Sequence, residues 1–344
     1  MFSFLAKKKP TTARINAVPV TVNPKETLLQ AALRQGVDFP HSCRVGGCAT
    51  CKCKLVTGKV KELTQTAYIL SDEELDQGYI LACQAVPQTD ITIEVDLSQQ
   101  QAHRQVTGRV IGQDKLTHDI TQLRVQLDET LTYKAGQFAN ISVAPLSELS
   151  RSYSFATAVQ PDSQVSFFVR QVPGGAFSTL INESDVMGQA VTVDGPLGDF
   201  WLRPADAPML LMAGGSGLAP IVALLQEALK DKVSRPVTLL FGAREERDLY
   251  ALDTLNDIAA RWPARFTFVP VLSATSADAP WQGERGMVHD KLAALIEPGA
   301  HAYLCGPPAM IDACTAVLLQ HGVSREHIHA DRFTTLHDAP GAAA

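Results

Sequence analysis

The sequence predicts a multidomain protein that joins an α+β N-terminal domain to an antiparallel β-barrel and a doubly wound α/β domain. The length of 344 residues suits two or three domains, at roughly 100–200 residues each. Short β-type segments broken by Gly and Pro run from residue 105 to 203 and favour a barrel. From residue 204 to 344, apolar strands alternate with helical stretches, which is typical of a parallel sheet covered on both faces.

Composition excludes several classes of protein. Hydrophobic residues make up 46% and charged residues 19%, the balance of a globular chain rather than a disordered or fibrous one. The net charge of −6 argues against a nucleic-acid partner. The apolar runs are all much shorter than the ~20 residues of a membrane span, and the Lys7–Lys9 run follows apolar residues, the reverse of a signal peptide. We therefore expect a cytoplasmic protein that contacts neither nucleic acid nor membrane.

The first domain is expected over residues 1–97. It contains a strand pair over 14–22, a helix over 27–36, a short acidic helix over 72–77 and a strand over 91–95. A polar stretch without periodicity, residues 98–104, is interpreted as a linker.

Cysteines cluster in this first domain in a pattern that indicates a metal centre. Cys43, Cys48 and Cys51 form C-x4-C-x2-C, and Cys83 follows after 31 residues. This is the plant-type spacing of [2Fe–2S] ligands, and a structural zinc site, which uses closely spaced ligand pairs, fits it poorly. Cys53 is left over. It is expected to share a face with Cys51 as a buried small residue, with an alternative ligand as the second interpretation.

The second domain, 105–203, carries a pattern suited to a flavin. Strands are expected over 105–111, 120–126, 138–143, 152–156, 165–169 and 190–194, with a short helix over 176–182. Arg151, Tyr153 and Ser154 offer a cation for a phosphate diester, an aromatic ring for stacking and a hydroxyl for a ring nitrogen. Gly175 and Ser178 open the short helix, where free N–H groups favour a pyrophosphate.

The third domain, 204–344, has two loops suited to a dinucleotide. Strands over 209–213, 237–241, 265–271 and 302–305 alternate with helices over 220–230, 249–260, 287–296 and 308–320. Gly215 and Gly217 stand between a strand and a helix, where glycine permits close approach of the backbone to a dinucleotide. Cys305 and Gly306 end another strand, where open α/β sheets bind ligands. Cys305 is a possible nucleophile, but a packing contact is the favoured interpretation.

The end of the second strand of this domain bears on the choice of nicotinamide cofactor. Arg244 and Arg247 could bind the 2′-phosphate of NADPH. Glu245, Glu246 and Asp248 make the stretch 241–248 acidic, however, and the third domain has more acidic than basic residues. Arg244 can instead lie over the adenine ring, so the sequence favours NADH.

Taken together, the three motif sets resemble the reductase components of multicomponent oxygenases, such as benzoate dioxygenase reductase and phenol hydroxylase reductase. In this family a β-grasp-like, plant-type ferredoxin domain precedes a ferredoxin–NADP reductase-like module with an FAD barrel and an NAD domain. The resemblance implies electron flow from NADH through FAD and a [2Fe–2S] cluster to a terminal oxygenase of Rieske, di-iron or P450 type. We also expect a monomer.

The resemblance also implies roles for individual residues. Arg151, Tyr153 and Ser154 would lie along the flavin. Gly175 and Ser178 would hold the FAD pyrophosphate. The residues expected at the nicotinamide dinucleotide are Gly215, Gly217, Gly306 and Arg244. Ser154 would lie near flavin N5 and Cys305 near the point of hydride transfer. Phe333 resembles the terminal aromatic residue of relatives, although eleven residues follow it.

Other interpretations remain open at this point. The same modules occur in reductases of deoxysugar dehydratases, and a non-catalytic redox adaptor could retain the folds without a cofactor. His327 and His329 could form a metal pair, or could simply lie on one face of a strand.

The order of the redox centres gives a first testable prediction. Replacing Cys83→Ser should abolish the cluster but spare NADH-driven reduction of ferricyanide, because the flavin precedes the cluster in the electron path. Visible absorbance and the ferricyanide assay measure the two effects. A variant that keeps its flavin but loses ferricyanide activity would contradict this order.

Overall fold

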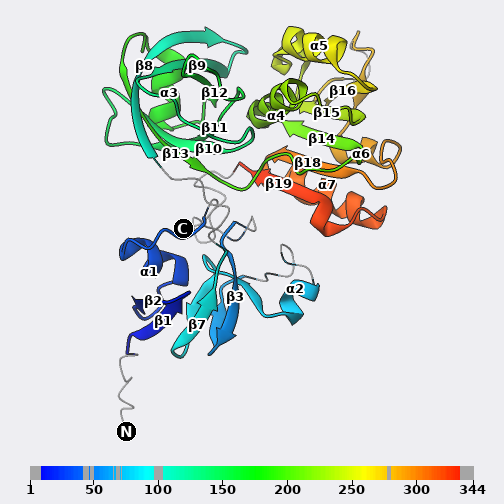
Figure 1. Ribbon diagram of the computed structural model, residues 1–344. Coiled ribbons are helices and arrows are strands. Elements are labelled where there is room, and N and C mark those ends of the chain that lie inside the picture. The colour runs from blue at the N-terminus through cyan, green and yellow to red at the C-terminus, as the bar shows by residue number, and fades with distance from the viewer. Residues whose placement is uncertain are drawn as a thin grey trace. The chain divides into compact units, whose positions relative to one another are not determined.

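The computed structural model describes residues 9–41, 46, 50–64, 66, 70, 72–96, 104–276 and 280–333 (Figure 1). These residues form two compact units, one up to residue 96 and the other from residue 104 to 333. Each unit is described by itself.

The described part of the N-terminal unit contains a mixed five-stranded sheet, a two-stranded sheet of β4 and β6, and two helices. The strands of the five-stranded sheet run in the order β2-β1-β7-β3-β5, and only β1 and β7 pair in parallel. The Thr27 hydroxyl accepts a hydrogen bond from the backbone of Gln30 and caps helix α1. The elements are β1 Thr11–Ile15, β2 Val18–Val22, α1 Leu28–Arg34, β3 Lys52–Thr57, β4 Val60–Glu62, α2 Asp72–Asp76, β5 Tyr79–Leu81, β6 Ala85–Pro87 and β7 Ile91–Glu94.

The second unit begins with the antiparallel barrel that the sequence predicts. Six strands pair in the order β11-β10-β13-β8-β9-β12, and a bridge from Phe155 to Phe167 brings the two edges together. Side chains facing inward, among them Phe155 and Phe177, fill the barrel. The elements are β8 Arg104–Lys115, β9 Ile120–Leu127, β10 Phe138–Val143, β11 Arg151–Ser154, β12 Gln164–Arg170, α3 Ala176–Glu183 and β13 Ala190–Leu197.

A six-stranded parallel sheet completes the second unit, in the order β17-β16-β15-β14-β18-β19. Along β14, Leu211 and Ala213 pack in one core with helix α4, while Leu210 and Met212 pack in another with α7, so the sheet is doubly wound as predicted. The strands are β14 Met209–Gly214, β15 Val237–Ala243, β16 Phe266–Leu272, β17 Glu284–Arg285, β18 His301–Gly306 and β19 Ile328–Arg332. The helices are α4 Leu218–Lys230, α5 Leu252–Arg261, α6 Val288–Leu292 and α7 Pro308–Gln320.

The barrel and the parallel sheet share one hydrophobic core. Phe168 and Phe200 of the barrel segment belong to the same buried cluster as Leu218 and Val222 of α4. The Glu227 carboxylate of α4 accepts a hydrogen bond of 3.3 Å from the backbone of Ala135. These contacts hold the two domains in a defined relation.

Some details differ from the sequence expectation. Helix α4 begins at Leu218 rather than at Pro220, and α6 ends at Leu292, four residues early. Strand β13, predicted over 190–194, continues to Leu197. Strand β17 was not predicted, because it has two residues, and β19 was anticipated only as the strand alternative for His327 and His329, since it is polar at three of its five positions.

Three histidines gather at the start of β18 and β19. The rings of His301 and His327 stack with centroids 4.1 Å apart, and His329 stacks on Tyr303 at 4.9 Å. Contrary to the strand expectation, His327 lies in a 3-10 turn and only His329 is on a strand. Burial, assisted by the charge of Arg203, lowers the pKa of His329 to about 4.

This shift predicts how stability depends on pH. Because the folded pKa of His329 lies below its ordinary value of 6.5, the folded state binds fewer protons than the unfolded chain between these values. Stability contributed by neutral His329 is then full above about pH 6.5 and is lost as pH falls toward 4, by up to about 2 kcal/mol at pH 5. His329→Gln should flatten the decline in Tm between pH 7.5 and 5. The exposed His321→Gln is the control, and equal slopes for both variants would refute the expectation.

Candidate cofactor sites

The described part of the cysteine site fits an iron–sulfur cluster. Cys51 and Cys83 are 2% and 4% exposed, and the amide of Gln84 donates to the Cys83 sulfur at 3.6 Å. Gly46 has a φ of +78°, and a Cβ there would lie 2.8 Å from Gln84 Cγ, so the chain turns too tightly for a larger residue. Cys43 and Cys48 lie outside the described residues.

Cys53 lies in the core of the same domain. It is 1% exposed, one residue into strand β3. Burial, with a contribution from nearby Cys83, raises the pKa of its thiol well above the ordinary value. The residue packs as the buried small side chain that alternation predicted.

Strand β11 carries the three residues predicted to contact the flavin, and they differ in how far they are buried. Arg151 is exposed, and within the described chain the hydrogen bond found for its guanidinium goes to the carbonyl of Ser150 at 2.8 Å. Tyr153 is half-buried, with its ring centroid 5.6 Å from that of Phe177. Ser154 is 4% exposed. An exposed guanidinium beside an aromatic face is compatible with a phosphate and a ring system of FAD.

The loop before α3 is built around Ser178. Its hydroxyl accepts a hydrogen bond from the Val172 backbone at 3.0 Å and donates to the Gly175 carbonyl at 3.1 Å. Gly175 stands at the N-cap with no side chain to bond the first-turn N–H groups, so these donors suit a pyrophosphate. Ser178 shapes the loop in this structure, and the backbone supplies the donors.

A residue that sequence reasoning missed meets Ser154. The Ser154 hydroxyl donates to the Asp331 carboxylate of β19 at 3.4 Å. Asp331 is the register partner of Cys305 on β18. Burial, with the nearby Asp331 charge, raises the pKa of the Cys305 thiol well above its ordinary value. Cys305 is therefore a protonated, fully buried thiol, which favours packing over nucleophilic chemistry. The sequence feature that could have pointed to Asp331 is its position two residues before Phe333, the aromatic residue expected at the flavin site.

The nucleotide loop follows β14 and needs its glycines. A Cβ on Gly217 would lie 2.3 Å from the Cys305 carbonyl oxygen, and Gly215 has a φ of +54°. The Tyr250 hydroxyl donates to the Gly215 carbonyl at 2.9 Å and holds the loop. Gly306, with a φ of +151°, lies against the backbone of Gly214 and also accepts from the Phe333 backbone at 2.9 Å. Sheet pairing brings the two predicted loops together.

One pocket of about 390 Å³ opens at this edge of the sheet. The parallel-sheet domain lines most of it, through the segments that follow β14, β15, β16, β17 and β18. The barrel contributes Asp119, Ile120 and Arg170 to its wall. A ligand in this pocket therefore contacts both domains, at the position where open α/β sheets bind dinucleotides.

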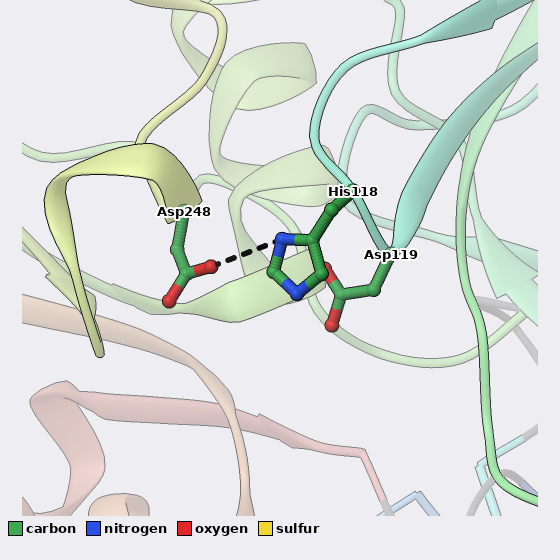
Figure 2. A group of neighbouring side chains, drawn as sticks. All are labelled: His118, Asp119 and Asp248. Carbon is green, nitrogen blue, oxygen red and sulfur yellow. Dashed lines mark ion pairs between the residues drawn. The ribbon is translucent and has the colours of Figure 1, made fainter.

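Arg244 lies on the wall of this pocket among carboxylates. Its guanidinium is 3.8 Å from Asp119 and 3.7 Å from Asp248, with the side chain 58% exposed. Arg247 pairs with Glu245 at 2.9 Å instead. Figure 2 shows Asp119 and Asp248 on either side of His118, coming from different domains.

Comparison with known families identifies three domain types in order. Residues 13–88 match the 2Fe-2S iron-sulfur cluster binding domain, residues 107–201 the oxidoreductase FAD-binding domain and residues 211–316 the oxidoreductase NAD-binding domain. These matches define the chain as an oxidoreductase with iron–sulfur, FAD and NAD domains, as the motifs predict.

Relatives that match nearly the whole chain define the class of oxidoreductase more closely. The xylene/toluene monooxygenase electron transfer component of Pseudomonas putida is 42% identical over 90% of this chain and 89% of its own length. The phenol 2-monooxygenase reductase component of Pseudomonas sp. strain CF600 is 35% identical over 94% of both chains. The crystal structure of an Amycolatopsis cytochrome P450 reductase has a TM-score of 0.72 at 35% identity, covering 94% of this chain and 99% of that one.

The chain belongs to the family of iron–sulfur flavoprotein reductases that serve as electron transfer components of oxygenase systems. The resemblance drawn from the motifs is thereby confirmed. Among the described residues, the helices are all too short or too polar to cross a membrane.

The exposed guanidinium of Arg151 generates a prediction about flavin retention. Arg151→Ala should weaken FAD binding about ten- to hundredfold, because charge-assisted hydrogen bonds to phosphate contribute ~1.5–3 kcal/mol. FAD dissociation, followed by flavin fluorescence, measures the effect. Arg109→Ala is the matched control, since Arg109 is an exposed arginine on β8 of the same barrel. Unchanged FAD affinity in Arg151→Ala would remove this residue from the site.

Proposed function

We propose that this protein oxidises NADH at the pocket shared by its barrel and parallel-sheet domains and passes the electrons to a terminal oxygenase. The observation that carries the proposal is the composition of that pocket. Asp119, Ile120 and Arg170 of the barrel share its wall with the loops after β14 and β18. A dinucleotide bound there would contact the flavin domain as well as the parallel sheet, as expected of a site that serves a flavin held by the barrel.

The chemistry at this pocket belongs to the cofactors. A bound FAD would supply the conversion between the two-electron chemistry of a nicotinamide and the one-electron chemistry of a [2Fe–2S] cluster. The protein's part is to bind and orient the two rings and to exclude water. Ser154 and Asp331 form a hydroxyl–carboxylate pair, 3.4 Å apart, that can hold a proton near the flavin ring.

Each predicted site residue has a role in this proposal. Arg151 binds the FAD pyrophosphate, assisted by the N–H groups of α3 after Gly175 and the loop that Ser178 shapes. Tyr153 stacks along the flavin. Gly215, Gly217 and Gly306 allow the dinucleotide to approach the backbone. Cys305 would be a packing contact near the nicotinamide, and Phe333 packs on the core that the two domains share.

We further propose the domain boundaries 1–97, 105–203 and 204–344, with Cys43, Cys48, Cys51 and Cys83 as cluster ligands. The names of the relatives, a xylene/toluene and a phenol monooxygenase component, support a partner oxygenase that acts on aromatic compounds. A direct test is electron delivery to purified oxygenases. If the reductase supported only a deoxysugar dehydratase, the oxygenase assignment would fail.

Cofactor preference is the quantitative test of this function. The carboxylates of Asp119 and Asp248, both within 4 Å of Arg244, would repel a 2′-phosphate, so kcat/KM for ferricyanide reduction should be higher with NADH than with NADPH. Steady-state kinetics on the intact reductase measure both values. A ratio in favour of NADPH would contradict the proposal and identify Arg244 as a phosphate ligand.

A further inference from the structure

The barrel contributes charged side chains to the pocket at the adenosine end of the proposed site. His118 and Asp119 lie in the turn between β8 and β9, and Arg170 ends β12. Arg244 and Asp248 follow β15 in the other domain. Figure 2 shows His118 reaching Asp248 across the boundary between the domains.

Asp119 is the centre of this network. One of its oxygens, Oδ2, lies 2.9 Å from Arg170 Nε and 3.8 Å from Arg244 Nη2. Burial favours its neutral form, but the hydrogen bond and charge of Arg170 keep the pKa of Asp119 below its ordinary value. Asp119 is therefore ionised at neutral pH and attracts Arg244 from one side, while Asp248 does so from the other at 3.7 Å.

The network is not suited to a metal ion, although ligand atoms of His118, Asp119 and Asp248 lie within 4.8 Å of one another. Arg170 and Arg244 already form ion pairs with the two carboxylates. A cation placed among the three ligands would meet both guanidinium groups. The arrangement is better explained as an ion-pair network between the domains.

We propose that Asp119, a residue of the FAD domain, determines the cofactor selectivity of the neighbouring NAD domain. The inference rests on the proposed function. Arg244 lines the pocket, whereas Arg247 is paired elsewhere, so Arg244 is the arginine that a 2′-phosphate would use. Asp119 engages this guanidinium and adds a negative charge beside the phosphate position. The uncharged ribose of NADH meets no such repulsion.

Asp119 also has a structural role that the test must separate. It accepts a hydrogen bond of 3.0 Å from Thr117 and binds Arg170, whose guanidinium lies close to Gly215. Loss of this support would affect NADH and NADPH alike. The diagnostic quantity is therefore the ratio of kcat/KM for the two cofactors rather than either activity alone.

Asp119→Asn keeps the shape of the side chain and removes its charge. We expect the NADPH/NADH ratio of kcat/KM for ferricyanide reduction to rise about tenfold, mainly through a lower KM for NADPH. Asp119→Glu, which retains the charge, should keep the original preference for NADH. Adding Arg244→Ala to Asp119→Asn should abolish the gain, because the gain depends on the released guanidinium.

Asp114→Asn is the matched control. Asp114 of β8 forms an ion pair of 3.0 Å with Arg124 of β9 and does not line the pocket. These two strands are the ones joined by the turn that carries Asp119. The inference would be overturned if the NADPH/NADH ratio of kcat/KM in Asp119→Asn stayed within twofold of that in the unmodified protein. It would also be overturned if Asp114→Asn raised this ratio as much as Asp119→Asn does. A rise that survives Arg244→Ala would overturn it as well.

A measurement on the unmodified protein keeps the test decisive if Asp119→Asn does not hold FAD. Salt screens charges, so raising ionic strength should increase the NADPH/NADH ratio if the site repels the 2′-phosphate. A falling ratio would mean attraction and would overturn the inference. If the holoprotein showed no NADH-driven reduction of ferricyanide at all, the proposed function itself would be wrong, rather than the inference about Asp119.

Discussion

The pairing of β14 with β18 is the interaction on which the candidate sites depend most. Ala213 is the register partner of Cys305, and the chain leaves both strands at the same edge of the sheet. The two strands are neighbours in the sheet but not in the sequence, and the direction of the strand order reverses between them. The loops after them diverge there, and open α/β sheets bind dinucleotides in a crevice of this kind.

A second constraint is the core shared by the barrel and helix α4. Phe168 and Phe200 pack with Leu218 in one buried cluster, and burial of such side chains contributes roughly 1.5–3 kcal/mol each. This packing presents the turn carrying Asp119 to the pocket wall. Hydride transfer needs two rings in near contact, and a rigid interface meets that need better than a flexible linker.

Much of this arrangement could be predicted because it follows from local patterns. Strand β10 and helix α7 have the predicted bounds, since the alternation of apolar residues and the Pro at the start of α7 are visible in the sequence. Strand β19 has no such apolar pattern, and the alternation of His327 and His329 suggested it only as one of two interpretations. Its polar residues are stabilised by pairing with β18 and by the packing of Asp331 beside Ser154.

The sequence by itself determined the domain order, the plant-type cysteine spacing, the strand that carries Arg151, Tyr153 and Ser154, and the glycine loops, because each depends on residue types at short spacing. Only the tertiary structure decided that Asp331 meets Ser154, that Cys305 is buried, and that Asp119 reaches Arg244 across a domain boundary. Asp119 and Arg244 are 125 positions apart. Contacts at such separation depend on how sheets and helices pack, which no local pattern encodes.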